Sequence, residues 1–271
     1  MTFVEKLLAA ASAHDSLLCV GLDPVPESLP PHLGREVDSV VRFGRAIIEA
    51  TSDLVCAFKP NLAFYEALGT GGLEALVRTL DAVPPDVAVI GDAKRGDVGS
   101  SSAAYARALF DHFRFDAVTV SPYLGHDSIE PFLDYAGRGV FVLCRTSNPG
   151  AHDFQDLLVD GEPLYVRVAR QTLSWKRRGD LGFVVGATYP AEIARVRSLA
   201  PDVPLLVPGV GAQGGSLEAA VRAAVDGKGE LAVVNSSRQV LYASQGPDFA
   251  AAAASVASRT RAQINAARRT A

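Results

Sequence analysis

Two aspartates and a lysine stand close together after a short apolar run of this sequence. Residues 87–90 are apolar and predict a buried strand, and Asp92, Lys94 and Asp97 follow it. Residues two apart in an extended chain project from the same face, so Asp92 and Lys94 are expected to lie together. Opposite charges at the end of a buried strand are costly unless they are paired or used in chemistry.

Three interpretations of this group are open. The first is a structural ion pair that closes the strand. The second is a lysine kept charged by its neighbouring carboxylates, which can give a proton to a developing carbanion. The third is a set of oxygen ligands for Mg²⁺, with the lysine balancing the charge. Asp97 lies beyond Gly96, so spacing alone does not predict whether it points toward the other two.

The elements around this group repeat a simple pattern. Eight short segments are predominantly apolar and do not alternate with polar residues, as expected for parallel strands that are covered on both faces. They are residues 17–22, 55–58, 87–90, 116–120, 139–144, 182–186, 203–207 and 231–235. Helical patterns separate them at residues 36–52, 71–80, 103–113, 128–135, 162–178, 190–199 and 214–225.

This alternation predicts an α/β protein with a (β/α)₈ barrel, the TIM-barrel fold class. A doubly wound sheet is the main alternative, but residues 21–24 are not the Gly-rich fingerprint that such a sheet usually carries after its first strand. We expect one domain over residues 1–271, with an N-terminal helix (1–14) and a C-terminal helix (247–268). The loop that ends near Gly161 is long enough to be a lid or binding loop.

Composition narrows the class of protein. The chain has 271 residues, is 48% hydrophobic and 21% charged, and carries a formal net charge of −4. It has no basic patch for nucleic acid, no bilayer-length apolar run and no signal peptide, so we expect a cytoplasmic protein without nucleic-acid or membrane partners. The three cysteines and five histidines are scattered, which favours buried reduced thiols over disulfides or zinc.

Polar residues recur where the predicted strands end. In a (β/α)₈ barrel, active sites form at the carboxyl ends of the strands, from the loops that follow them. The residues in these positions are Asp23, Lys59, Asp92 with Lys94, Ser147, the glycine-rich stretch 208–215, and Asn235 to Arg238. Glycines after the seventh strand let backbone N–H groups approach an anion, and Arg238 can bind phosphate oxygens as a fork. We therefore predict a phosphate site there.

The order of these short motifs resembles the orotidine 5′-phosphate decarboxylase family, in particular its longer bacterial branch (type 2). The resemblance runs from about residue 17 to residue 243. It is carried by residues 21–24 (GLDP), 58–61 (FKPN), 92–99 (DAKRGDVG), 146–150 (TSNPG), 208–215 (PGVGAQGG) and 237–238 (SR).

The resemblance implies a carboxy-lyase that converts orotidine 5′-phosphate to UMP, the last step of de novo pyrimidine biosynthesis, without metal or organic cofactor. It assigns Lys94 as the proton donor to C6 of the pyrimidine, and places Asp92 beside the departing carboxylate. It also implies a homodimer with shared active sites, in which Asp97 and Ser101 reach the site of the partner subunit.

The same resemblance assigns the groups that bind substrate. Asp23 and Lys59 would hold ribose hydroxyls, and Ser147 would contact the pyrimidine edge. Phosphate would be bound by Gln213 and Arg238, with a loop made from Gly209, Gly211, Gly214 and Ser237.

Three features depart from the family pattern or stay without a role. Many relatives carry Thr where this chain has Ser101. Residues 235–237 are less glycine-rich than in many relatives, which leaves open which backbone groups bind phosphate there. Residues 188–189, after the sixth strand, match no motif.

Two other functions stay open from the residues. A Mg²⁺-dependent sugar-phosphate decarboxylase or aldolase of the same superfamily would use the acidic motif as a metal clamp. A non-catalytic phosphometabolite-binding barrel is the alternative from another class, and it would not need Lys94 as a proton donor.

Overall fold

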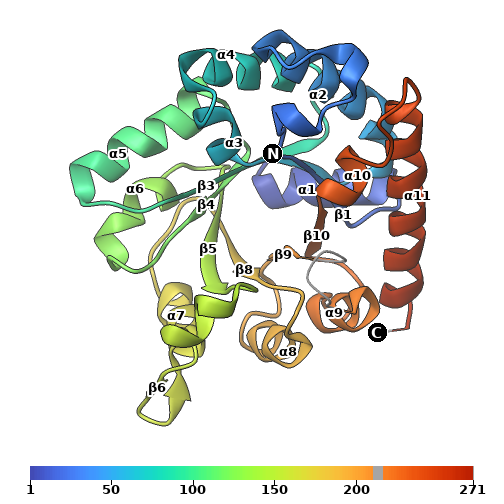
Figure 1. Ribbon diagram of the computed structural model, residues 1–271. Coiled ribbons are helices and arrows are strands. Elements are labelled where there is room, and N and C mark those ends of the chain that lie inside the picture. The colour runs from blue at the N-terminus through green and yellow to red at the C-terminus, as the bar shows by residue number, and fades with distance from the viewer. Residues whose placement is uncertain (210–215, 271) are drawn as a thin grey trace.

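The computed structural model describes residues 1–209 and 216–270. Within them, eight parallel strands close into a barrel in the order β1-β10-β9-β8-β5-β4-β3-β2, with helices around it (Figure 1). The barrel strands are β1 (Leu18–Leu22), β2 (Ala57–Pro60), β3 (Ala88–Arg95), β4 (Ala117–Val120), β5 (Gly139–Arg145), β8 (Asp180–Val185), β9 (Leu205–Val207) and β10 (Ala232–Ser236). The predicted (β/α)₈ barrel is confirmed, and each predicted strand corresponds to one of these eight.

The helices bury one apolar face against the barrel. In α2 the apolar residues Val40, Phe43, Ile47 and Ile48 recur at helical spacing, and all are buried. The helices are α1 (Phe3–Ala13), α2 (Val37–Thr51), α3 (Leu62–Glu66), α4 (Gly69–Leu80), α5 (Gly99–Arg107), α6 (Glu130–Leu133), α7 (Leu164–Leu173), α8 (Pro190–Leu199), α9 (Leu217–Ala224), α10 (Arg238–Leu241) and α11 (Phe249–Arg268).

The two terminal helices lie where the sequence predicts them. A capping box between Thr2 and Glu5 begins α1. This helix lies against the amino ends of the strands, where Phe3 meets Phe141 edge-on and Lys6 pairs with Asp116 at 2.8 Å. Helix α11 packs against α2, α9 and β1. The amino end of the barrel is therefore covered, and the carboxyl end is left for loops.

Phe141 shows how the barrel interior is filled. It is fully buried, and a Cβ atom at Gly182 on the neighbouring strand β8 would lie 2.4 Å from its ring. Only glycine leaves room for the ring at this position. The three cysteines are buried and free, as predicted. No helix in the described part of the chain has the length and apolar character needed to cross a membrane.

The segment between β5 and α7 differs from the predicted loop. It contains a short 3₁₀ helix, Pro149–Asp153, and an antiparallel hairpin of β6 (Leu158–Val159) and β7 (Glu162–Pro163). Figure 1 shows the hairpin projecting beside α7. Its turn residues Asp160 and Gly161 both have positive φ, 54° and 79°. Asp-Gly is a strong signal for such a two-residue turn, and it was available in the sequence.

Two predicted helices have different bounds. The helix expected over 162–178 ends at Leu173, and the basic run that follows lies beyond it, although Arg177 still donates to the Leu173 carbonyl oxygen at 3.1 Å. The helix expected over 103–113 begins earlier, at Gly99, and gives way to a π-helical turn over Ala108–His112. The short helices α3 and α10 were not predicted. Each comes shortly after the carboxyl end of a strand, where apolar residues do not recur at helical spacing over a long enough stretch.

Candidate active site

The centre of the candidate site is the Asp92 carboxylate at the carboxyl end of β3. One oxygen, Oδ2, accepts from Lys59 Nζ of β2 at 2.8 Å. The other, Oδ1, accepts from Lys94 Nζ at 2.5 Å and from the hydroxyl of Thr119 in β4 at 3.0 Å. The prediction that Asp92 and Lys94 lie together is therefore confirmed. The side chains of three adjacent strands converge on one carboxylate.

The two lysines of this cluster differ in exposure. The side chain of Lys59 is 4% exposed, whereas that of Lys94 is 48% exposed. Lys59 therefore holds Asp92 from inside the barrel. Lys94 has its ammonium group at the mouth, where a ligand can reach it.

The charges of the cluster stabilise one another. Burial alone would raise the pKa of Asp92, but the nearby ammonium groups of Lys59 and Lys94 outweigh burial and hold that pKa well below its usual value. Burial would likewise lower the pKa of Lys59, but the Asp92 and Asp23 carboxylates outweigh it and raise that pKa. Asp92 and Lys59 are therefore both charged at neutral pH.

The backbone of Lys94 has an unusual conformation. Its φ is +48°, in the left-handed region that non-glycine residues rarely adopt. The Lys94 N–H donates to Thr119 Oγ1 at 3.0 Å, and the pairing of β3 with β4 shifts register between Gly91 and Arg95. The Thr119 hydroxyl thus holds both the backbone of Lys94 and the carboxylate that binds its ammonium group. A residue in this strained region at a strand end is a common mark of a functional site.

The exits of β1 and β10 form a second polar part of the site. A Cβ atom at Gly21 would lie 1.9 Å from Ser237 Oγ and 3.3 Å from Asp23 Oδ2, so these two predicted residues lie beside the same glycine. Asn235 donates to Ser237 Oγ at 3.2 Å. The buried oxygens Asp23 Oδ1, Asn235 Oδ1 and Ser236 Oγ accept or donate no hydrogen bond within the described residues. Such atoms are positions for polar groups of a ligand, because buried polar atoms ordinarily have partners.

Ser147 lies at the carboxyl ends of β5 and β8. It follows β5, and a Cβ atom at Gly186, just after β8, would lie 2.6 Å from its Cβ atom. Thr188 Oγ1, two residues further along, is another buried oxygen without a partner among the residues described. The fold therefore places Ser147 at a second strand pair, away from the lysines of β2 and β3 in the strand order.

Asp97 and Ser101 are not brought to the Asp92 cluster within the chain. The Asp97 carboxylate accepts from the Val98 N–H at 2.7 Å, and in the described part of the chain it forms no ion pair. Ser101 lies in the first turn of α5, and Val98 before it is exposed. Spacing left the direction of Asp97 open, and within the described residues the structure joins only Asp92 and Lys94.

The predicted phosphate region is described in part. Gly209 has a φ of +92°, which glycine adopts without strain. Arg238 is exposed and begins α10 directly after Ser237. Gly211, Gln213 and Gly214 lie outside the described residues.

Thr119 is the functional residue that the sequence reasoning missed. Its signal is a single hydroxyl within the apolar strand β4, where its neighbours Val118 and Val120 are buried. A buried hydroxyl needs a hydrogen-bond partner, so its presence in such a strand is informative.

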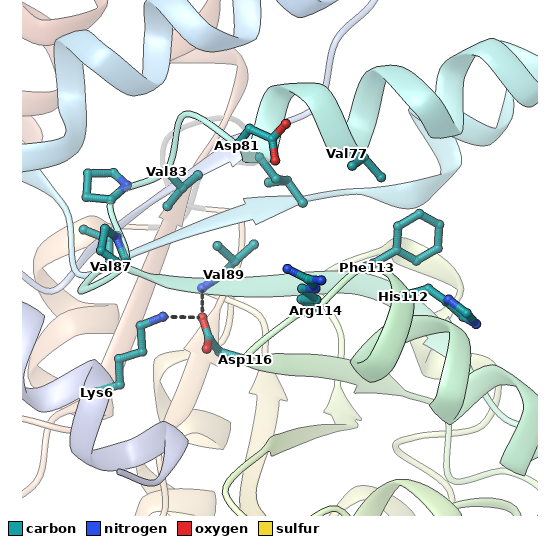
Figure 2. Close-up of a pocket in the computed structure, with 13 residues that line it drawn as sticks. Lys6, Val77, Asp81, Val83, Val87, Val89, His112, Phe113, Arg114 and Asp116 are labelled. Atoms are coloured by element: carbon teal, nitrogen blue, oxygen red, sulfur yellow. Dashed lines mark hydrogen bonds and ion pairs between the residues drawn. The ribbon is translucent and has the colours of Figure 1, made fainter.

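A cavity of about 630 Å³ lies at the other end of the barrel (Figure 2). It opens beside the Lys6–Asp116 ion pair, near α1, α4 and the amino ends of β3 and β4, and it contains none of the predicted site residues. In the residues that the structure describes, no three His, Cys, Asp or Glu side chains gather in a metal-binding arrangement.

Comparisons with known proteins show the family to which the chain belongs. The model of the orotidine 5′-phosphate decarboxylase / HUMPS family matches residues 16–254. The orotidine 5′-phosphate decarboxylases of Herpetosiphon aurantiacus and Azoarcus sp. are 54% and 53% identical to this chain, over 94% and 98% of it and 95% and 99% of their own lengths. The solved structure of Leishmania donovani OMP decarboxylase superposes with a TM-score of 0.87 at 40% identity, and 99% of each chain is covered.

Proposed function

The chain belongs to the orotidine 5′-phosphate decarboxylase / HUMPS family, and from this premise we propose how its residues act. Its activity is the carboxy-lyase reaction that converts orotidine 5′-phosphate (OMP) to UMP in pyrimidine biosynthesis. The proposal concerns the residues that carry the reaction, the assembly that completes the site, and the absence of a cofactor.

Lys94 is the proton donor. Breaking the bond between C6 of the pyrimidine and its carboxylate releases CO₂ and leaves an electron pair on C6. An ammonium group at the barrel mouth can then protonate that carbon as the charge develops. The observation that carries this assignment is the ion pair of Lys94 Nζ with Asp92 Oδ1 at 2.5 Å, made by a lysine side chain that is half exposed.

Asp92 acts through its charge. The low pKa of its carboxylate keeps it ionised, and the substrate carboxylate would lie beside it in the bound complex. Repulsion between the two carboxylates disappears when CO₂ leaves, so it raises the energy of the bound substrate more than that of the transition state. Lys59 keeps Asp92 in place and charged throughout.

The remaining residues bind the substrate. Asp23 and Lys59 bind ribose hydroxyls, and the buried Asp23 Oδ1, which has no hydrogen-bond partner among the described residues, supports this role. Ser147 contacts the pyrimidine edge from the exit of β5. The phosphate is bound after β9 and β10 by Gln213 and Arg238, with the loop glycines Gly209, Gly211 and Gly214 and the nearby Ser237.

Two copies of the chain complete two sites. Asp97 lies on the connection from β3 to α5, and Ser101 lies in the first turn of α5. The Asp97 carboxylate forms no ion pair with Lys94 of its own chain in the described residues. In a homodimer the Asp97 and Ser101 side chains reach the site of the partner subunit. The reaction uses no metal or organic cofactor, since proton transfer and charge repulsion need neither.

One experiment tests the proton donor and the shared site together. Lys94→Ala and Asp97→Asn are prepared separately, and each is expected to lose about 10²- to 10⁴-fold in kcat for UMP formation. Lys6→Met, which breaks a lysine–aspartate pair at the other end of the barrel, is the control and keeps turnover. All assays contain excess EDTA, and loss of wild-type turnover there would favour the Mg²⁺-dependent alternative.

Heterodimers of the two inactive variants then decide where Asp97 acts. With shared sites, one site of each heterodimer contains both substitutions and the other contains neither, so activity returns. If each chain builds its own site, the heterodimers stay inactive. Near wild-type turnover in Lys94→Ala alone would remove the proton-donor role.

A further inference from the structure

A buried arginine, Arg145, lies two residues before Ser147 in the chain. Arg145 ends β5 and its side chain is 1% exposed. It binds both carboxylate oxygens of Asp156, through Nε at 2.8 Å and Nη2 at 3.0 Å. Asp156 lies in the connection from β5 to α7, so this bidentate pair ties that connection to the barrel wall.

Tyr189 and His152 complete the cluster. The Arg145 guanidinium carbon lies 4.2 Å from the centre of the Tyr189 ring, which follows β8. His152 Nδ1 contacts Asp156 Oδ2, and its Nε2 lies 3.3 Å from the Tyr189 hydroxyl. Tyr189, which matches no motif in the sequence, thus covers a buried cation with its aromatic face.

The same cluster fixes the residue that precedes Ser147. Arg145 Nη1 donates to the Thr146 carbonyl oxygen at 2.5 Å, and Gln155 Oε1 accepts from the Thr146 N–H at 2.8 Å. The Thr146 hydroxyl donates to Asn148 Oδ1 at 2.6 Å and accepts from Gln155 Nε2 at 2.9 Å. Every polar group of Thr146 is therefore held by the arginine or by its own loop.

We propose that Arg145, Asp156 and Tyr189 are positioning residues that hold Ser147 against the pyrimidine edge of the substrate. This rests on the proposed role of Ser147. The cluster around Arg145 contacts neither Asp92 nor Lys94. We therefore expect it to affect substrate binding and to leave the proton transfer unchanged. A bidentate arginine–carboxylate pair suits this task because its two parallel bonds fix orientation as well as distance.

The test compares Asp156→Asn and Tyr189→Leu with two matched controls. Asp160→Asn breaks the exposed Arg167–Asp160 pair of the same connection, and Tyr189→Phe keeps the aromatic face over Arg145. We expect Asp156→Asn to raise KM for OMP about tenfold, as for the loss of a charged hydrogen bond, with kcat changed by less than about twofold. Tyr189→Leu changes KM in the same direction, and the two controls leave it near the wild-type value.

A double-mutant cycle with Ser147→Ala separates positioning from general loosening. If the cluster acts through Ser147, Asp156→Asn adds little to the KM of Ser147→Ala. Additive effects on KM, or a fall in kcat at constant KM, would overturn the proposal. If Ser147→Ala raises KM and Asp156→Asn does not, only the positioning role fails. If Ser147→Ala leaves KM unchanged, the proposed role of Ser147 fails as well.

Discussion

Replacing Thr119 with Val removes one hydroxyl from the centre of the site and keeps the shape of the side chain. In the native protein that hydroxyl donates to Asp92 Oδ1 and accepts from the Lys94 N–H, both at 3.0 Å. Thr119 is fully buried, so no water replaces the lost group from the surface. The variant leaves the Lys94 N–H without its partner and frees one side of the Asp92 carboxylate.

The size of the effect follows from these two bonds. A hydrogen bond to a charged group contributes about 1.5–3 kcal/mol and a neutral one about 1 kcal/mol. The bond to Lys94 also holds a left-handed backbone that costs roughly 1–2 kcal/mol for a non-glycine residue. The two bonds together contribute about 2.5–4 kcal/mol. If about 1.4–2.8 kcal/mol of this falls on the transition state, kcat drops about 10- to 100-fold.

The assay is steady-state conversion of OMP to UMP, with urea unfolding of the same samples. Thr119→Ser keeps the hydroxyl and is the matched control, expected to stay within about threefold of wild-type kcat because both hydrogen bonds survive. Thr119→Val is expected to lose kcat with a smaller change in KM. A kcat within twofold of wild type in a folded Thr119→Val variant would refute the idea that Thr119 positions Lys94.

Two further predictions concern stability. Arg197 is 9% exposed, and among the described residues it donates only to carbonyl oxygens, including those of Ala224 and Leu231 at 2.9 Å each. Arg197→Met leaves those oxygens unpaired and should lower the free energy of unfolding in urea by about 3 kcal/mol. An unchanged urea midpoint would contradict this. Burial raises the pKa of Cys56 and of Cys144 to about 12, while unfolded thiols ionise near pH 8.5. The unfolded state then binds fewer protons, so stability falls from about pH 8.5 upward by about 1.4 kcal/mol per pH unit for each thiol, and Cys144→Ala should show a shallower fall of unfolding free energy between pH 8.5 and 10.

Much of the fold follows from local pattern. Continuous apolar runs such as residues 139–144 predict strands covered on both faces, and the structure has strands at those places. The bounds of helices were less predictable, as the helix over 162–178 shows by ending at Leu173. Helix ends depend on local competition for the last carbonyl groups, and Arg177 takes part in that competition from outside the helix.

The connection from β5 to α7 shows a different limit. Asp160 and Gly161 predict a hairpin in the sequence, because both residue types are suited to a turn with two positive φ values. The pairing of Arg145 with Asp156 has no such local signal. Its donor ends a strand and its acceptor lies in a loop, and only the folded path of the chain brings them together.

By itself the sequence determined the alternation of strands and helices, and so the barrel and the end at which polar residues gather. It also determined the Asp92–Lys94 pair, since residues two apart in a strand share a face. Only the tertiary structure determined which other side chains bind the Asp92 carboxylate. Lys59 and Thr119 are 33 and 27 residues from Asp92, and both reach its carboxylate only because β2 and β4 flank β3 in the closed barrel. The predicted barrel implies this strand order, but the contacts also depend on the register between the strands, which shifts between Gly91 and Arg95 and which strands apolar on both faces specify only weakly.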